Sequence, residues 1–172
     1  MASTVDQARE AIRRWFDAAV RAVEPEQAVR QALSIDGRLL TLDGHRIEVS
    51  GRLIVVAVGK AALAMARAAQ VVAGDLIDAG VVLTKDGHAG DATLERFEIA
   101  EASHPIPDER GAAATRAILE HVSDLGEEDV VLALISGGGS ALLEATRPPV
   151  TLEDLATTTD LLLRAGAPIE AL

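Results

Sequence analysis

The chain has 172 residues, and its 49% hydrophobic content is enough for one core of ordinary domain size. A formal net charge of −11 and an aromatic content of 2% exclude a nucleic-acid-binding surface, which needs basic residues and aromatic platforms for stacking. The sequence contains no cysteine, which excludes disulfide frameworks, thiol catalysis and cysteine–zinc sites. No apolar run has the length of a membrane span and no signal-peptide core is present, so we expect a cytoplasmic protein without a membrane partner.

The first fifty residues predict a small helical segment followed by a hairpin. Apolar residues recur at helical spacing from Val5 to Val23, behind a capping box formed by Ser3 and Asp6. Pro25 predicts the start of a second helix that runs through Leu33. Residues 39–42 and 47–49 flank Asp43-Gly44, which is a typical hairpin turn.

After residue 50 the pattern becomes an alternation of apolar strands and helices. The predicted strands are residues 53–58, 80–84, 97–100 and 129–135, and the predicted helices are 61–73, 109–123 and a last one from Thr151 to about Gly166. Strands that are apolar throughout indicate a parallel sheet covered on both faces. We therefore predict a Rossmann-like α/β fold, with residues 1–172 forming a single domain.

A glycine-rich turn follows the last predicted strand directly. Consecutive glycines let successive backbone N–H groups point into one concavity, and a helix that starts straight afterwards adds its positive end. The turn therefore predicts a phosphate cradle; the alternative is a flexible linker. Its residues are Ser136, Gly137, Gly138, Gly139 and Ser140.

Only two of the 16 basic residues are lysines, and both end a predicted strand. Lys60 follows Gly59 after strand 53–58, and Lys85 follows strand 80–84. We predict that Lys60 is catalytic and that Gly59 and Lys85 contact the phosphate or nucleotide. Lysine carries a compact, mobile charge, whereas arginine is a planar fork, so this placement favours an ammonium at an anion site. The alternative is chance placement of two surface lysines. Because ligands bind at the carboxyl ends of parallel strands, we expect both lysines and the glycine turn to share one edge.

The loop after the third predicted strand holds two further candidates, His104 and Asp108, stiffened by Pro105 and Pro107. Three roles are open for them: general base toward a hydroxyl, phosphate contact, or support of other site residues. For Asp108 the alternative is the cap of the next helix. The sequence has no metal-binding motif, so we predict no metal held by this chain alone and expect Mg²⁺ to arrive with nucleotide phosphates.

Four segments in the same order resemble the glycerate 2-kinase family, in which an N-terminal domain of this type precedes a MOFRL domain. They are VAVGKAA at 56–62, VLTKDGH at 82–88, EASHPIPD at 101–108 and LISGGGSALL at 134–143. The resemblance implies ATP-dependent phosphorylation of glycerate to 2-phosphoglycerate, with Lys60 in the position of the family's active-site lysine. It implies cleft-edge positions for His104 and Asp108.

The resemblance covers nearly the whole chain but only the first part of a typical family member, so we expect a C-terminal domain as a partner. That domain is expected to supply the group that binds the substrate carboxylate. Two other functions stay open. One is a phosphate-ester or sugar-phosphate binding module without catalysis. The other is an oligomerising domain, a homodimer that pairs through the N-terminal aromatic helix or the alanine-rich helix 61–73. Some family members carry the name hydroxypyruvate reductase, but this sequence has no Gly-x-Gly-x-x-Gly fingerprint of a dinucleotide site.

Overall fold

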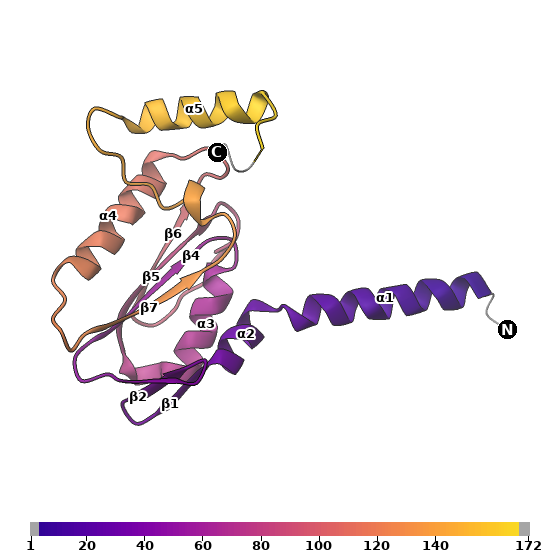
Figure 1. Ribbon diagram of the computed structural model, residues 1–172, viewed down its shortest axis with the longest axis horizontal. Helices are drawn as coiled ribbons and strands as arrows, with labels where there is room; N and C mark the ends of the chain where they lie inside the picture. Colours follow the sequence, from indigo (N-terminus) through magenta and orange to yellow (C-terminus); the bar gives the residue numbers. More distant parts are fainter. Residues whose placement is uncertain (1–3, 169–172) are drawn as a thin grey trace.

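The computed structural model describes residues 4–168, and its centre is a four-stranded parallel sheet with the strand order β6-β5-β4-β7 (Figure 1). The strands are β4 (Leu53–Val58), β5 (Ile77–Lys85), β6 (Phe97–Ala102) and β7 (Val130–Ile135). Helix α3 (Ala62–Ala73) packs on one face and α4 (Glu109–Ser123) on the other. The predicted parallel sheet with helices on both faces is confirmed.

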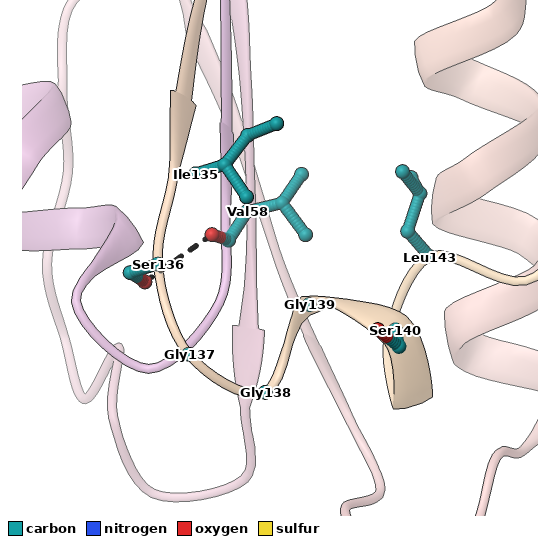
Figure 2. Close-up of a pocket in the computed structure, with 8 residues that line it drawn as sticks. All are labelled: Val58, Ile135, Ser136, Gly137, Gly138, Gly139, Ser140 and Leu143. Atoms are coloured by element: carbon teal, nitrogen blue, oxygen red, sulfur yellow. Dashed lines mark hydrogen bonds between the residues drawn. The ribbon is translucent and has the colours of Figure 1, made fainter. Parts of the chain in front are cut away.

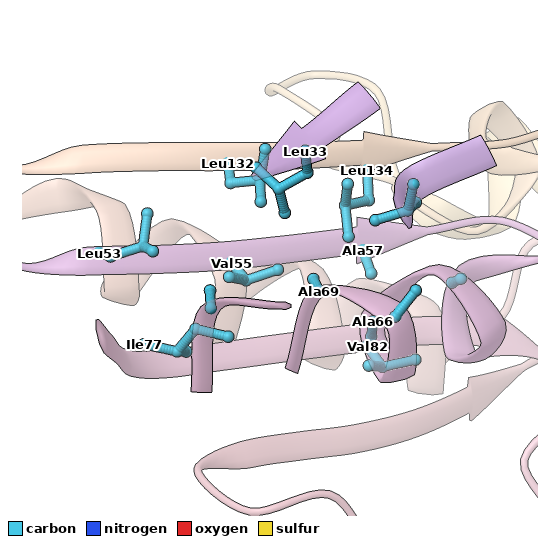
Figure 3. Packing of buried hydrophobic residues seen from close by; sticks show 14 of the residues in the cluster. Leu33, Leu53, Val55, Ala57, Ala66, Ala69, Ile77, Val82, Leu132 and Leu134 are labelled. Carbon is cyan, nitrogen blue, oxygen red and sulfur yellow. The ribbon is translucent and has the colours of Figure 1, made fainter. Parts of the chain in front are cut away.

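Alternate residues of β4 serve the two faces, because successive side chains of a strand point to opposite sides. Leu53, Val55 and Ala57 belong to the core beneath α3, which Figure 3 shows from close by. Ile54, Val56 and Val58 belong to the core beneath α4. Every residue of β4 is buried, which explains why its sequence is apolar without alternation.

The N-terminal part contains a strand that the sequence pattern did not reveal. It consists of α1 (Thr4–Ala22), α2 (Pro25–Ala32), β1 (Leu33–Asp36), β2 (Leu39–Leu42) and β3 (His45–Glu48). The three strands form an antiparallel sheet, so the prediction that the second helix includes Leu33 is wrong. Leu33 is buried as a strand residue opposite Leu42, and a four-residue strand is too short to show its own period.

The N-terminal part also tests one of two local predictions, a hairpin turn and a capping box. The hairpin turn at Asp43-Gly44 is confirmed, with positive φ at both residues (47° and 83°), as a type I′ turn requires. The predicted capping box at Ser3 lies outside the described residues.

Helix α1 stands away from the sheet (Figure 1). None of its residues is buried, and Ile12, Trp15 and Phe16 are exposed. Within residues 4–168, no helix combines the length and apolarity needed to cross a membrane.

The chain beyond β7 folds back over the carboxyl ends of the strands. A short 3₁₀ turn, η2 (Gly139–Ala141), follows the glycine loop, and helix α5 (Leu152–Arg164) lies above the sheet (Figure 1). The capping box of α5, formed by Thr151 and Asp154, is confirmed. A regular helix does not start directly after the glycines, so the helix-end contribution expected there is reduced to this single 3₁₀ turn.

The alanine-rich sequence of α3 sets how closely the helix approaches the sheet, which gives a stability prediction. Ala66 has no exposed surface, so Ala66→Leu must displace neighbours and should lower the free energy of unfolding by about 1–3 kcal/mol. Urea unfolding followed by far-ultraviolet circular dichroism measures this loss. Val71→Leu is the matched control, because Val71 is 64% exposed on the same helix and should tolerate the added bulk. Equal stability of the two variants would contradict the close packing.

Candidate functional site

The turn after β4 and the glycine loop after β7 meet at one end of the sheet. The two strands are neighbours and end in register, with Val58 opposite Ile135. The Lys60 N–H donates a hydrogen bond to the Gly137 carbonyl oxygen at 3.0 Å. The structure thus places Lys60 and the glycine turn at one edge of the sheet, as expected.

Ser136 fastens these two turns together. Its backbone N–H donates to the Val58 carbonyl at 2.9 Å, and its hydroxyl donates to the same carbonyl at 3.3 Å, the bond drawn in Figure 2. The hydroxyl also accepts the Ala61 N–H at 3.0 Å, immediately before α3. These bonds engage the Ser136 hydroxyl within the protein and hold the residue before α3 from another strand. The predicted contact of Ser136 with phosphate stays a prediction.

Close approach of the two turns requires Gly59. Its φ is +112°, and a Cβ at this position would lie 2.4 Å from the Ser136 hydroxyl oxygen and 2.5 Å from the Ser136 carbonyl oxygen. No larger residue fits there without separating the turns. Gly59 therefore shapes the backbone where the two turns meet, and its contact with phosphate stays a prediction.

The glycine loop presents unused hydrogen-bond donors. Among the hydrogen bonds of the described residues, none is donated by the backbone N–H of Gly137, Gly138 or Gly139. Gly138 is left-handed, with φ of +90°. A Cβ there would lie 3.0 Å from His104 Nε2 and 3.2 Å from Lys60 Cε, so both side chains pack against the loop. Unpaired amides beside an ammonium fit an anion such as a phosphate group.

His104 is poised to be uncharged at neutral pH. Partial burial lowers the pKa of the imidazole, and the positive charges of Lys60 and Lys85 lower it further. Lys85 is half-buried at the end of β5 and acts on the site through this charge. A neutral imidazole offers one donor and one acceptor to a ligand.

Asp108 serves mainly as a helix cap and part of an ion-pair network. Its carboxylate accepts the Gly111 N–H at 3.1 Å at the start of α4, and it pairs with Arg110 at 2.7 Å. Burial raises the pKa of Asp108, but the hydrogen bonds from Gly111 and Arg110 outweigh this, so its pKa lies below the usual value. Arg110 also binds Asp86 through two hydrogen bonds of 2.6 and 2.8 Å. Asp108 is therefore the N-cap of α4, which is the alternative that the sequence left open. It does not line either of the two hollows beside the glycine loop.

Two hollows share the glycine loop as a wall. One, of about 370 Å³, is lined by residues 136–140 and by Val58, Ile135 and Leu143 (Figure 2). The other, of about 500 Å³, lies between the loop and α5, and we call it the α5 cavity. It is lined by Lys60, His104, Pro105, Pro107, Gly138, Ser140, Ala141, Glu144, Leu155, Thr159 and Leu163. Gly138 and Ser140 belong to both hollows, so two ligands can approach one loop from two sides.

The α5 cavity contains residues that the sequence reading missed. Glu144 is the one acidic side chain among the residues that line it, and α5 contributes Leu155, Thr159 and Leu163. Spacing of four residues along α5 could have revealed a shared face, but nothing in the sequence says what this face covers. His88 was also missed: its Nδ1 lies 3.0 Å from the Lys60 carbonyl oxygen, so it supports the lysine turn from the loop after β5.

The residues fit a phosphorylated ligand better than a bound metal ion. Three unpaired amides and the Lys60 ammonium suit phosphate oxygens. In the part of the chain that the structure describes, no group of three or more acidic or histidine side chains could hold a metal ion.

Comparison with known proteins places this arrangement in context. The sequence pattern of a domain of unknown function, DUF4147, matches residues 11–172. A protein of Thermotoga maritima named D-glycerate 2-kinase is 46% identical over 154 residues, which cover 88% of this chain and 33% of that protein. A protein of Agrobacterium vitis named putative hydroxypyruvate reductase is 42% identical, covering 94% of this chain and 34% of its own length.

A solved structure from Pyrococcus horikoshii OT3 is also similar, with a TM-score of 0.82 and 38% identity. The match covers 99% of this chain and 37% of the other. The chain thus spans about one third of the length of the relatives it matches.

We expect the same substitution to have different effects at two neighbouring positions of the glycine loop. Gly138→Ala must adopt a left-handed backbone and meet His104 and Lys60, so the free energy of unfolding should fall by about 1–2 kcal/mol. Binding of inorganic phosphate, followed by calorimetry, should weaken as well. Gly137→Ala is the control, since a Cβ there meets nothing within 4 Å. Matching stability and phosphate binding in the two variants would show that Gly138 does not shape the loop.

We expect the two serines of the loop to have different roles: Ser136 contributes to stability, and Ser140 contacts the ligand. Ser136→Ala removes the acceptor of the Ala61 N–H and should cost about 0.5–2 kcal/mol of unfolding free energy. Ser140 is exposed toward both hollows, so Ser140→Ala should leave the melting temperature nearly unchanged. Thermal unfolding with and without 10-fold excess phosphate over its dissociation constant measures both effects, because a bound ligand stabilises the native state. The reverse pattern would refute this division.

Proposed function

This chain belongs to the DUF4147 family, and from that membership we propose that it supplies the phosphate-binding half of an ATP-dependent kinase that converts glycerate to 2-phosphoglycerate. The observation that carries the proposal is the packing of the Lys60 side chain against Gly138, in a loop whose three glycine amides donate no hydrogen bond within the described residues. Relatives named glycerate 2-kinase support the substrate. Because those relatives are about three times longer, the complete active site is proposed to include a further C-terminal domain.

The arrangement suits phosphoryl transfer, in which positioning and charge neutralisation supply most of the rate. The amides of residues 137–139 hold the phosphate oxygens of the donor. Lys60 neutralises negative charge that spreads over the transferred group. His104, uncharged at neutral pH, donates or accepts one hydrogen bond beside them. Mg²⁺ bound to the nucleotide would add charge neutralisation between the phosphates.

The smaller hollow suits the donor nucleotide. Val58, Ile135 and Leu143 give it aliphatic walls, and residues 136–140 give it the loop amides. The chain has too few aromatic residues for a stacking platform, so we place the base on this aliphatic surface. The larger α5 cavity, which holds Lys60 and Glu144, then receives the acceptor.

The name hydroxypyruvate reductase, carried by a relative, fits this chain less well. Reduction by a nicotinamide cofactor is typically served by a Gly-x-Gly-x-x-Gly turn at the start of a helix. The sequence contains no such turn, and its glycine loop leads into a single 3₁₀ turn. These observations favour phosphotransfer over hydride transfer.

A second candidate function is a phosphate-ester binding module without catalysis. One observation favours it: the cradle is built from this chain alone, from two adjoining turns of one sheet. Calorimetry separates the candidates. Binding of 2-phosphoglycerate that survives Lys60→Ala, with no turnover in the presence of the expected C-terminal domain, supports the module.

The kinase proposal predicts a specific effect of removing the ammonium. With the C-terminal domain supplied, Lys60→Ala should lower kcat for glycerate phosphorylation about 100- to 1,000-fold, because charge on the transferred group loses its partner. A coupled ADP-release assay measures the loss. Arg67→Ala is the control: it removes an exposed positive charge from α3 and should keep full turnover. Unchanged kcat in Lys60→Ala would show that another group performs this role.

A further inference from the structure

Resting on the proposed function, we propose that Glu144 recognises the acceptor by accepting a hydrogen bond from one of its hydroxyl groups in the α5 cavity. Glu144 follows the glycine loop by four residues and lines the same cavity as Lys60 and His104. The ligand class is a small hydroxy acid, one hydroxyl group of which faces Glu144.

The turn after the glycine loop places three successive residues, 142–144, in three different environments. Leu142 is completely buried in the core beneath α4. Leu143 lines the smaller hollow, and Glu144 lines the α5 cavity. The carboxylate is therefore directed into the cavity by the same turn that carries the glycine loop.

A buried hydroxyl on α4 holds this turn in place. The Glu144 N–H donates to Thr115 Oγ1 at 3.0 Å, and Thr115 Oγ1 donates to the Gly111 carbonyl at 2.8 Å. Thr115 is 3% exposed, so its two bonds are shielded from water. The backbone of Glu144 is thus fixed by a helix that lies on the other side of the turn.

The charges around Glu144 leave its carboxylate available to a ligand. The titratable groups that line the α5 cavity are Lys60, His104 and Glu144, and α5 adds only Leu155, Thr159 and Leu163. Within residues 4–168, no ion pair or side-chain hydrogen bond of the Glu144 carboxylate is present. Burial raises the pKa of this carboxyl, with no neighbouring charge to offset it.

Hydrogen-bond chemistry decides which part of the ligand Glu144 can bind. An ionised carboxylate only accepts hydrogen bonds, so it repels the carboxylate and phosphate groups of substrate or product. A hydroxyl group donates, and it is the feature that distinguishes a hydroxy acid from a simple acid. Lys60 and the loop amides bind the phosphate group that is transferred, and Glu144 binds a hydroxyl group of the acceptor.

The raised pKa has a consequence for stability that supports a functional role. Where the folded-state pKa of an acid lies above the unfolded value, the native state binds more protons, so stability falls as pH rises through the interval between the two values. At neutral pH, Glu144→Gln should therefore unfold at a temperature equal to or above that of the unmodified protein. A side chain kept for structure alone would show a loss.

The test is a binding comparison that does not need turnover. Isothermal calorimetry compares D-glycerate with two analogues, D-lactate, which lacks the C3 hydroxyl, and 3-hydroxypropanoate, which lacks the C2 hydroxyl. The unmodified protein should bind glycerate about 10- to 100-fold more tightly than one of the analogues, as expected for a hydrogen bond to a charged acceptor. Glu144→Ala should abolish this preference.

Matched variants make the outcome decisive. Glu120→Gln and Glu120→Ala change an exposed carboxylate of α4 outside the α5 cavity and should keep the preference. If Glu144→Ala and the unmodified protein discriminate equally, the inference about Glu144 is overturned while the kinase proposal stands. If the unmodified protein binds phosphate but not glycerate, the acceptor assignment fails and the inference with it. If it binds neither, the phosphate-binding proposal itself is overturned.

Discussion

The contact between the turns after β4 and β7 is the constraint on which the site depends. The two strands lie side by side and end in register, so their turns emerge together, and Ser136 and the Lys60 N–H then join them. Gly59 makes the contact possible, because any Cβ would collide with Ser136. This contact holds the start of α3, the lysine turn and the glycine loop together. Positioning of this kind is what phosphoryl transfer requires from a protein.

The surface charge of the chain and the charge of its site are opposite in sign. An overall net charge of −11 repels anionic ligands at long range, yet Lys60 and Lys85 gather at the carboxyl ends of β4 and β5, beside the unpaired amides. Partial burial and these two charges lower the pKa of His104. Positive charge is therefore local to the site, and an anion at a distance meets the negative charge of the whole chain.

The sequence predicted the elements whose residue pattern is local. It did not predict the role of a residue when that role depends on contacts with residues distant in the chain. Uniformly apolar strands such as 53–58 and the glycine-rich loop are recognisable from local sequence, so the parallel sheet and the edge where the loop meets the Lys60 turn were predictable. Strand β1 was missed because its first residue, Leu33, continues the helical spacing of α2 and its four residues are too few to show the period of a strand. The internal bonds of Ser136 and the cavity position of Glu144 arise from partners 75 and 29 residues away, which spacing alone does not reveal.

Helix α1 has an optical consequence. Trp15 is the single tryptophan of the chain, and it is 70% exposed on a helix with no buried residue. Its indole already emits as a water-exposed chromophore, so intrinsic fluorescence is nearly blind to melting of the distant sheet. Any polypeptide that covers α1, whether a second copy or a further domain, will instead move this emission to shorter wavelength. The fluorophore is a built-in reporter of assembly and a poor reporter of unfolding.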